Sequence, residues 1–313
     1  MTSLAAAARG ARADDGHWHE FERRRVWYRR SGAGRPAMVF LPNATLTWRL
    51  WEQQVEHFSA THDVIAVDLP GFGRSDRLPD PGPSLALYVR WLERFVADLE
   101  LAPVVLVGNC LGSLTALHYA ARRPEAVSAL VLMHTLTREA NAAGSLGRFT
   151  PILRNPLLRR LARRKMRRMP LARQRHFPYV RDQLGSRPCP SGRAYLDHVA
   201  RCYAEPETRL AQLRLGRDFD NWVLPDSSAL AGRPPLCWIW GDANRLLPLE
   251  TGRRQVEALA PEEVHVLEGC GYAAPQERPG EVTRIIERFL ALYAREAAGR
   301  LGAAGSNTPW PVG

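Results

Sequence analysis

Hydrophobic and polar positions follow two alternating patterns along most of this chain. Short apolar runs are typical of buried strands, and stretches with apolar residues every three or four positions are typical of amphipathic helices. The predicted strands lie at 24–32, 37–42, 63–70, 104–108, 127–135, 235–241 and 264–269. The predicted helices lie at 48–60, 85–101, 110–123, 249–259 and 280–296. This alternation predicts an α/β fold with a mostly parallel sheet that helices cover on both faces.

The alternation is interrupted once, in the middle of the chain. Residues 136–232 have helical, arginine-rich patterns without strands, so we predict a helical cap inserted into a core of residues 21–135 and 233–297. Ligands bind beyond the carboxyl ends of the strands in such sheets, and we expect the cap to cover that end. Residues 1–20 and 298–313 lack apolar periodicity and are predicted to be flexible tails.

The positive charge of the chain is concentrated in the predicted cap. The formal net charge is +11, yet residues 141–181 alone contain 12 Arg or Lys and no Asp or Glu. Within them, PLLRRLARRKMRRM (156–169) places apolar residues on one helical face, which we expect to pack over the cleft. Its charged face would meet solvent, an acidic acyl carrier protein or an anionic membrane surface. Nucleic acid is not expected, because no recognition motif accompanies the charge.

Cofactor and targeting signals are weak. The five cysteines are irregularly spaced without a CxxC pair, which favours a reduced, cytoplasmic setting and no metal site. We expect no transmembrane segment and no secretory signal, because no apolar stretch of the required length occurs. PGFGRSD (70–76) contains only part of a dinucleotide-binding pattern, so no nucleotide cofactor is implied.

The strongest candidate chemistry lies in VVLVGNCLGSLTALHYA (104–120), where a strand meets a helix through Gly-x-Cys-x-Gly. Gly108 and Gly112 let a sharp turn pass close to neighbouring backbone, and the turn would direct Cys110 into the cleft. The positive end of the following helix is expected to lower the pKa of the thiol. The backbone N–H of Leu111 is expected to face a developing oxyanion.

Five motifs, in this order, resemble those of the α/β-hydrolase family. They are FLPN (40–43), VIAVDLPGFGRSD (64–76), GNCLG (108–112), WGDANRLLP (240–248) and GCGYAAPQERP (269–279). The resemblance covers about residues 24–135 and 233–296 and implies an α/β-hydrolase fold. It gives residues 136–232 the place of that family's variable cap.

The resemblance also assigns the working positions, and the side chains there depart from the family pattern. Cys110 stands at the nucleophile position in place of the usual serine. Asn244 falls on the position of the acid and Tyr272 on that of the histidine. The backbone of Ala44 would supply the other oxyanion donor. The sequence therefore has the family's nucleophile turn without its usual base and acid.

These substitutions change the expected chemistry. A phenol is a poor base near neutral pH and an amide carries no charge, so we expect Tyr272 and Asn244 to share a neutral hydrogen bond. A thiol needs less activation than a hydroxyl, and Cys110 would attack an activated ester or thioester unaided. Release of the acyl group from Cys110 to water needs a base that removes a proton from the water molecule. The sequence thus favours acyl transfer over hydrolysis, by an enzyme of small-molecule metabolism.

Several polar residues are candidates for auxiliary roles. His134, at the end of a predicted strand, is a candidate replacement base, and Asp242 is a candidate replacement acid. Asn109 stands beside the nucleophile position, and Asn43 lies in the oxyanion motif. A second hypothesis uses Tyr272 as a proton donor and Asn43 as a polarising amide in a lyase, cyclase or isomerase. A third is a binding protein without turnover.

Overall fold

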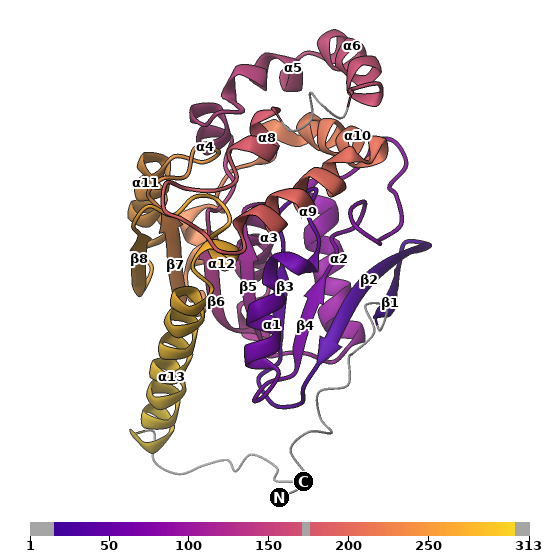
Figure 1. The fold of residues 1–313 in the computed structure, drawn as a ribbon. Helices are drawn as coiled ribbons and strands as arrows, with labels where there is room; N and C mark the ends of the chain where they lie inside the picture. Colours follow the sequence, from indigo (N-terminus) through magenta and orange to yellow (C-terminus); the bar gives the residue numbers. More distant parts are fainter. Residues whose placement is uncertain (1–15, 171–175, 304–313) are drawn as a thin grey trace, which may run out of the picture.

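The computed structural model describes residues 16–170 and 176–303, and it contains an eight-stranded sheet between two layers of helices (Figure 1). The strand order is β1-β2-β4-β3-β5-β6-β7-β8. Pairing is antiparallel for β1 with β2 and β2 with β4, and parallel elsewhere, so the predicted mostly parallel sheet is confirmed. The strands are β1 His17–Phe21, β2 Arg24–Ser31, β3 Met38–Leu41, β4 Val64–Val67, β5 Val104–Asn109, β6 Val127–Met133, β7 Leu236–Gly241 and β8 Glu263–Leu267.

The core helices cover both faces of this sheet. They are α1 Glu52–Phe58, α2 Leu85–Asp98, α3 Leu111–Arg122, α11 Leu249–Leu259, α12 Ala274–Glu277 and α13 Pro279–Ala303, with the 3-10 helices η1 Trp48–Trp51 and η2 Pro124–Ala126. Apolar residues of α2, α3 and α11 pack on one face, and those of α1 and α13 pack on the other. Side chains of β5 alternate between the two layers, as expected for a strand buried on both sides.

Helices of the cap gather at one end of the sheet, at the top of Figure 1. They are α4 Arg138–Ala143, η3 Gly147–Phe149, α5 Thr150–Arg154, α6 Pro156–Arg167, α8 Pro178–Arg181, α9 Gly192–Ala204, α10 Pro206–Leu215, η4 Gly216–Asn221 and η5 Ser227–Leu230. Cap residues line a cavity together with Cys110, which directly follows β5. The cap therefore lies over the carboxyl ends of the parallel strands. No helix in the described ranges is long and apolar enough to cross a membrane.

Both predicted tails are too long. β1 pairs with β2 and buries Phe21, and His19 Nε2 lies 3.0 Å from Asp98 Oδ2 of α2. The segment HWHEF is short, and its contact with Asp98 is made 79 positions away, so it gave little local signal. At the other end α13 continues to Ala303. The remainder of the predicted tails, residues 1–15 and 304–313, lies outside the described residues.

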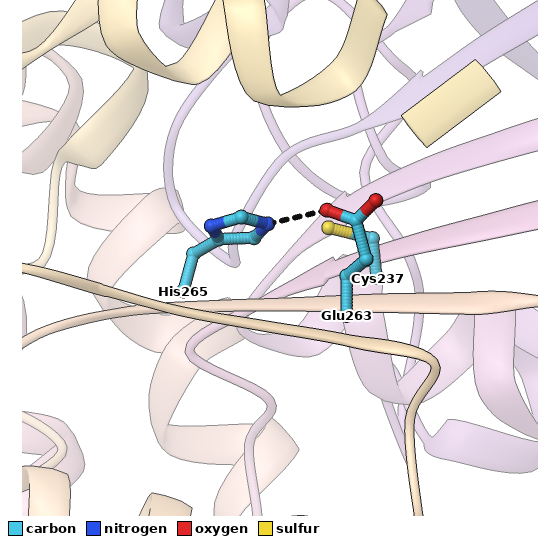
Figure 2. A group of neighbouring side chains, drawn as sticks. All are labelled: Cys237, Glu263 and His265. Carbon is cyan, nitrogen blue, oxygen red and sulfur yellow. Dashed lines mark hydrogen bonds and ion pairs between the residues drawn. The ribbon is translucent and has the colours of Figure 1, made fainter. Parts of the chain in front are cut away.

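The register of β7 and β8 places three polar side chains on one face of the sheet edge, Cys237, Glu263 and His265 (Figure 2). His265 Nε2 lies 2.6 Å from Glu263 Oε2, and Arg288 of α13 donates to the same oxygen at 3.0 Å. The Arg288 guanidinium supplies a counter-charge for the carboxylate. We interpret the cluster as an ion-pair group that ties α13 to the sheet edge.

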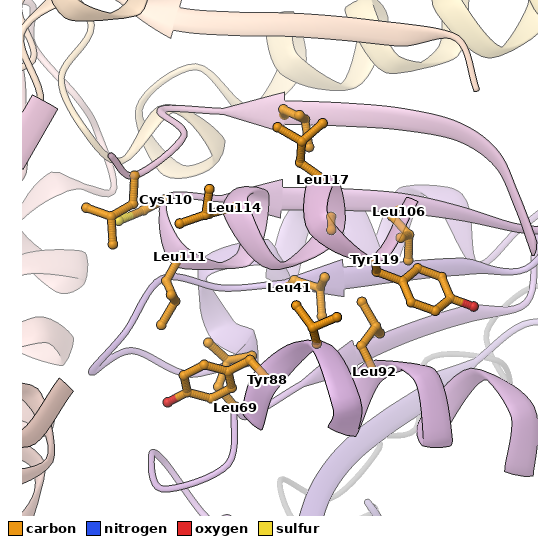
Figure 3. Packing of buried hydrophobic residues seen from close by; sticks show 14 of the residues in the cluster. Leu41, Leu69, Tyr88, Leu92, Leu106, Cys110, Leu111, Leu114, Leu117 and Tyr119 are labelled. Carbon is orange, nitrogen blue, oxygen red and sulfur yellow. The ribbon is translucent and has the colours of Figure 1, made fainter. Parts of the chain in front are cut away.

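Close packing of α3 on β3 sets the position of the turn after β5. A Cβ atom added at Gly112 would lie 2.2 Å from the carbonyl oxygen of Leu41, which is backbone and cannot move aside cheaply. Figure 3 shows this layer, with Cys110 at its end beside Leu111 and Leu114. Glycine is therefore required at position 112, because there is no space for a Cβ atom.

Replacing this glycine should destabilise the fold. We expect Gly112→Ala to cost about 1–3 kcal/mol through overpacking and to lower Tm by about 2–4 °C per kcal/mol, as measured by circular dichroism. Gly280→Ala is the matched control, because the added Cβ atom would lie 3.6 Å from Arg284 Nη1, an ordinary van der Waals contact. An unchanged Tm for Gly112→Ala would show that α3 and β3 are free to separate.

Candidate active site

A cavity between the cap and the sheet contains the candidate active site. Its space free of protein atoms is about 930 Å³, including the part that is open to solvent. The core contributes Ala44, Cys110 and Tyr272, and the cap contributes mainly apolar side chains such as Phe149 and Met166. A small molecule with an apolar body would fit such a site.

Cys110 occupies a strained turn between β5 and α3. Its φ of 56° and ψ of −110° lie where residues with a Cβ atom are rarely found. The turn is tight, because a Cβ atom at Gly108 would lie 2.5 Å from the backbone nitrogen of Ser113. The Cys110 side chain is 6% exposed and lines the cavity. The Gly-x-Cys-x-Gly pattern thus forms a sharp turn that presents sulfur to the cavity.

The environment of Cys110 does not lower its pKa as the sequence suggested. Burial raises the pKa of the thiol to about 12, although hydrogen bonds from the Tyr272 side chain and the Leu111 backbone act in the opposite direction. The loss of water around the thiolate outweighs the positive helix end. Near neutral pH, Cys110 is therefore a protonated thiol.

Tyr272 lies in the loop between β8 and α12, in contact with Cys110. Its side chain forms hydrogen bonds with Cys110 and Asn43, and burial raises its pKa well above the usual value. The predicted hydrogen bond to Asn244 is wrong. Asn244 Oδ1 instead accepts from the backbone nitrogens of Leu246 at 3.0 Å and Leu247 at 2.9 Å, and within the described chain its Nδ2 has no partner. Asn244 therefore stabilises the loop in which it lies.

The loop after β3 is held by a tyrosine from the cap. Asn43 Nδ2 donates to Tyr179 Oη at 3.1 Å, and Tyr179 Oη donates to the Ala44 carbonyl at 2.5 Å. The N–H of Ala44 makes no hydrogen bond with the described part of the chain. This donor remains available to a ligand in the cavity. The Leu111 N–H, the other expected oxyanion donor, is instead engaged with the Cys110 sulfur.

His134 is fully buried behind Tyr272, and both of its ring nitrogens have partners. Nδ1 lies 2.9 Å from Asn109 Oδ1, and Nε2 accepts from the Gly241 backbone nitrogen at 2.9 Å. Nδ1 must then carry the proton and donate it to Asn109, and burial lowers the pKa of His134 to about 3. The ring stacks on Tyr272 at 5.9 Å between centroids. His134 therefore positions its neighbours and has no lone pair free for the thiol proton.

Asp242, the other candidate auxiliary, belongs to the loop backbone. Its side chain is exposed, and Oδ1 accepts from the Gly269 nitrogen at 2.6 Å. It makes no hydrogen bond to Cys110 or Tyr272 in the part of the chain that the structure describes. The geometry thus does not place it as a replacement acid.

Two cap residues at the site were not found from the sequence. Tyr179 bonds to the loop after β3, and Arg209 is buried in the cavity wall. The arginine is hidden among many others in the cap sequence. For Tyr179, the signal available in the sequence was that an aromatic residue directly follows Phe177-Pro178, outside the arginine-rich helix.

Fewer apolar residues of the basic helix α6 line the cavity than the sequence predicted. Ala162 and Met166 line the cavity, whereas Leu157 is 66%, Leu158 38% and Leu161 63% exposed. The prediction that this apolar face packs over the cleft is thus only partly right. A single helix at the rim of a cap contacts its neighbours along a narrow strip, which leaves the other leucines in solvent.

Residues that could hold a metal ion come together at one place in the described ranges, Cys237, Glu263 and His265, with ligand atoms within 4.8 Å of one another. They lie at the sheet edge and do not line the cavity. The cavity lining itself includes the Cys110 thiol, the phenols of Tyr179 and Tyr272, the amides of Asn141 and Gln212, and the guanidinium of Arg209.

The chain is similar to known hydrolases in sequence. It is 28% identical over 294 residues to a 2-hydroxy-6-oxononadienedioate/2-hydroxy-6-oxononatrienedioate hydrolase of Burkholderia vietnamiensis, a match that covers 85% of this chain and 91% of that enzyme. It is 26% identical over 283 residues to the hydrolase of the same name from Klebsiella pneumoniae subsp. pneumoniae, covering 83% and 88%.

Solved structures agree in fold, and a family profile identifies the family. A thermophilic esterase from Thermogutta terrifontis superposes with a TM-score of 0.69 at 19% identity, over 86% of this chain and 94% of that one. The profile of the alpha/beta hydrolase fold matches residues 36–277, which is most of the chain. The sheet order, the turn at Cys110 and this match lead to one conclusion: the chain belongs to the alpha/beta hydrolase fold family.

Proposed function

We propose that Cys110 accepts an acyl group from an activated ester or thioester and passes it to an acceptor other than water. The chain is a hydrolase-like enzyme that acts on small molecules, as its family and the names of its relatives indicate. The single observation that supports Cys110 as the acyl acceptor is that its thiol lies on the strained turn and faces an apolar cavity. This is the position from which a side chain can reach a bound carbonyl carbon.

The proposed first step needs no free base. Cys110 sulfur bonds to the carbonyl carbon while the oxyanion faces the N–H groups of Leu111 and Ala44. Tyr272 accepts the thiol proton as it donates its own proton to the leaving sulfur or oxygen. The bond between the carbonyl carbon and the leaving group then breaks, and the phenol is again protonated. Such a neutral relay suits groups whose pKa values are raised by burial.

Transfer is favoured over hydrolysis by what surrounds the acyl-enzyme. The described residues that line the cavity include no His, Asp or Glu. Water is a weak nucleophile that needs a base to remove its proton, whereas an amine or a thiol attacks a thioester more readily. We therefore expect an amine or thiol acceptor and slow release to water.

An acidic acyl carrier protein is the donor that we propose. Exposed basic residues lie at the rim of the cap: Arg160, Arg164, Lys165 and Arg167 of α6, and Arg168 directly after it. A partner of opposite charge would be steered toward this rim and would bring a thioester with it. The five cysteines are free thiols, which fits the proposed reduced, cytoplasmic setting.

A second candidate function uses no covalent intermediate. Tyr272, Asn43 and Tyr179 form a chain of neutral hydrogen-bonding groups beside the cavity, and the raised pKa of Cys110 favours an inert thiol. A lyase, cyclase or isomerase would use Tyr272 as the proton donor and Asn43 as the polarising amide. Loss of Cys110 would then leave turnover intact.

Replacement of the thiol separates the two candidates. Wild type should gain the acyl mass on Cys110 after incubation with acyl-pantetheine, and faster with the acyl carrier protein thioester. Cys110→Ala should gain none and lose about 10³-fold or more of transfer activity. Intact-protein mass spectrometry and product assays provide the measurements. Cys189→Ser, which changes a thiol outside the cavity lining, is the control; full activity of Cys110→Ala would exclude covalent catalysis.

Removal of the Tyr272 hydroxyl should slow acylation while the protein stays folded. We expect Tyr272→Phe to reduce the single-turnover acylation rate by about 10²–10⁴-fold, because the proton relay is lost. The ring stack on His134 is retained in this variant. Tyr119→Phe, in a buried position outside the cavity lining, should acylate at the wild-type rate. Equal rates in Tyr272→Phe and wild type would remove Tyr272 from the mechanism.

Alkylation of Cys110 should depend steeply on pH. Only the thiolate reacts with iodoacetamide, and burial raises the pKa of Cys110 to about 12. Below that pKa the thiolate fraction grows about tenfold per pH unit. The alkylation rate, followed by peptide mass spectrometry, should therefore keep rising from pH 7 to 10. A plateau near pH 9, as for an ordinary thiol, would contradict this environment.

A further inference from the structure

A second cavity lies in the cap, outside the one that contains Cys110, and arginines line most of it. Residues of α6, α10 and η4 enclose it, and its space free of protein atoms is about 930 Å³, including the part that is open to solvent. We call it the arginine pocket. Asp80, in the loop before α2, is the one carboxylate in the described lining. The arginines are Arg159, Arg160 and Arg163 of α6, Arg214 of α10 and Arg217 of η4.

Carboxylates pair with the arginines on the side of α10 and η4. Arg217 Nη1 donates to Asp80 Oδ1 at 3.4 Å, and Arg214 Nε lies 3.6 Å from the same oxygen. Glu207, outside the lining, lies 3.8 Å from Arg214 Nη1. The loop of Asp80 packs closely on α10, because a Cβ atom at Gly82 would lie 2.7 Å from Arg214 Cβ. This side of the pocket is therefore fixed and largely neutralised.

The α6 side of the pocket has no such carboxylate. A nitrogen of Arg159 donates to the Leu153 carbonyl. Within the described ranges, the side chains of Arg160 and Arg163 form no hydrogen bond and no ion pair. Like charges three or four positions apart on a helix repel each other, so this arrangement costs free energy unless an anion binds. The pocket therefore has positive charge that the described protein groups do not balance.

The arrangement of these charges favours a phosphate group. A phosphate presents charged oxygens in several directions, so separate guanidinium groups can donate to it at once, whereas the two oxygens of a carboxylate are matched by one guanidinium. Arg160 and Arg163 are both exposed to solvent, so a phosphate bound between them would keep part of its water shell. The desolvation cost of binding such a strongly hydrated group is then small.

The arginine pocket and the cavity of Cys110 share a wall. Leu213 of α10 lines both of them, and α6 contributes Ala162 and Met166 to the cavity and its arginines to the pocket. The two helices pack against each other in the upper part of Figure 1. A ligand with an apolar acyl group at one end and a phosphate at the other would therefore match both spaces.

We infer that the arginine pocket binds the phosphate of a pantetheine arm whose thioester lies in the cavity of Cys110. The inference deepens the proposed function, on which the identity of the thioester end rests. An acyl carrier protein holds its acyl group on such a phosphate-bearing arm, and coenzyme A contains the same arm. The exposed basic residues of α6 beside the pocket suit an acidic protein, so we assign the arm to the carrier protein.

Binding to a protein without the nucleophile tests the pocket. Pantetheine, 4′-phosphopantetheine and inorganic phosphate are titrated into Cys110→Ala by calorimetry. We expect 4′-phosphopantetheine to bind at least about tenfold more tightly than pantetheine, because it adds charge-assisted hydrogen bonds. The difference should shrink at high salt. Equal affinities would overturn the inference, and inorganic phosphate that binds as tightly as 4′-phosphopantetheine would overturn the assignment to a pantetheine arm.

Variants of the α6 arginines identify the groups responsible. Arg160→Gln combined with Arg163→Gln, in the same background, should weaken binding of 4′-phosphopantetheine about tenfold and leave that of pantetheine unchanged. Both side chains are exposed, so the variant should fold, which circular dichroism checks. Arg193→Gln, an exposed charge of α9 outside the pocket lining, is the control. An unchanged preference for the phosphate in the double variant would overturn the assignment to this pocket.

Acylation of the wild type separates this inference from the acyl-transfer proposal. Preferred binding of 4′-phosphopantetheine without any acyl adduct on Cys110 would support the pocket and reject covalent catalysis. An adduct without that preference would do the reverse. If both proposals hold, the acyl carrier protein thioester should acylate Cys110 faster than acyl-coenzyme A at equal concentration. The opposite order would overturn the carrier protein as the source of the arm.

Discussion

The site depends on the close contact between the start of α3 and the strand β3. Gly112 lies so near the Leu41 carbonyl that a side chain is excluded, and this contact holds Cys110 in its unfavourable backbone conformation. The strain is offset by packing of the α3 leucines on the sheet. Because the turn is set by the fold, the sulfur lies at the cavity although the described lining residues include no His, Asp or Glu.

Desolvation then determines the chemistry that this turn can perform. The cap closes an apolar cavity over Cys110, so the helix dipole that would stabilise a thiolate is outweighed and the thiol stays protonated. The same burial keeps the Tyr272 phenol neutral and leaves His134 an uncharged structural group. A site made of neutral donors and acceptors favours concerted proton transfer over reactions that need a separated ion pair.

The cap contributes side chains to the site and also covers the cavity. Tyr179 reaches the loop at Ala44 through two hydrogen bonds, and Arg209 brings a positive charge to the cavity wall. The cap therefore connects the loop after β3 to the cavity. Its outer surface is strongly basic along α6, in contrast to the mostly apolar lining of the cavity.

The sequence by itself determined most of the sheet and the turn at Cys110, because strand and helix periodicity and the Gly-x-Cys-x-Gly spacing are local signals. Tertiary structure decided the rest. The raised pKa of Cys110, the choice of Asn43 over Asn244 as partner of Tyr272, and the engagement of both His134 nitrogens depend on burial and on contacts between distant residues. Tyr179 and Asn43, for example, are 136 positions apart. Such contacts leave no periodic trace in the chain.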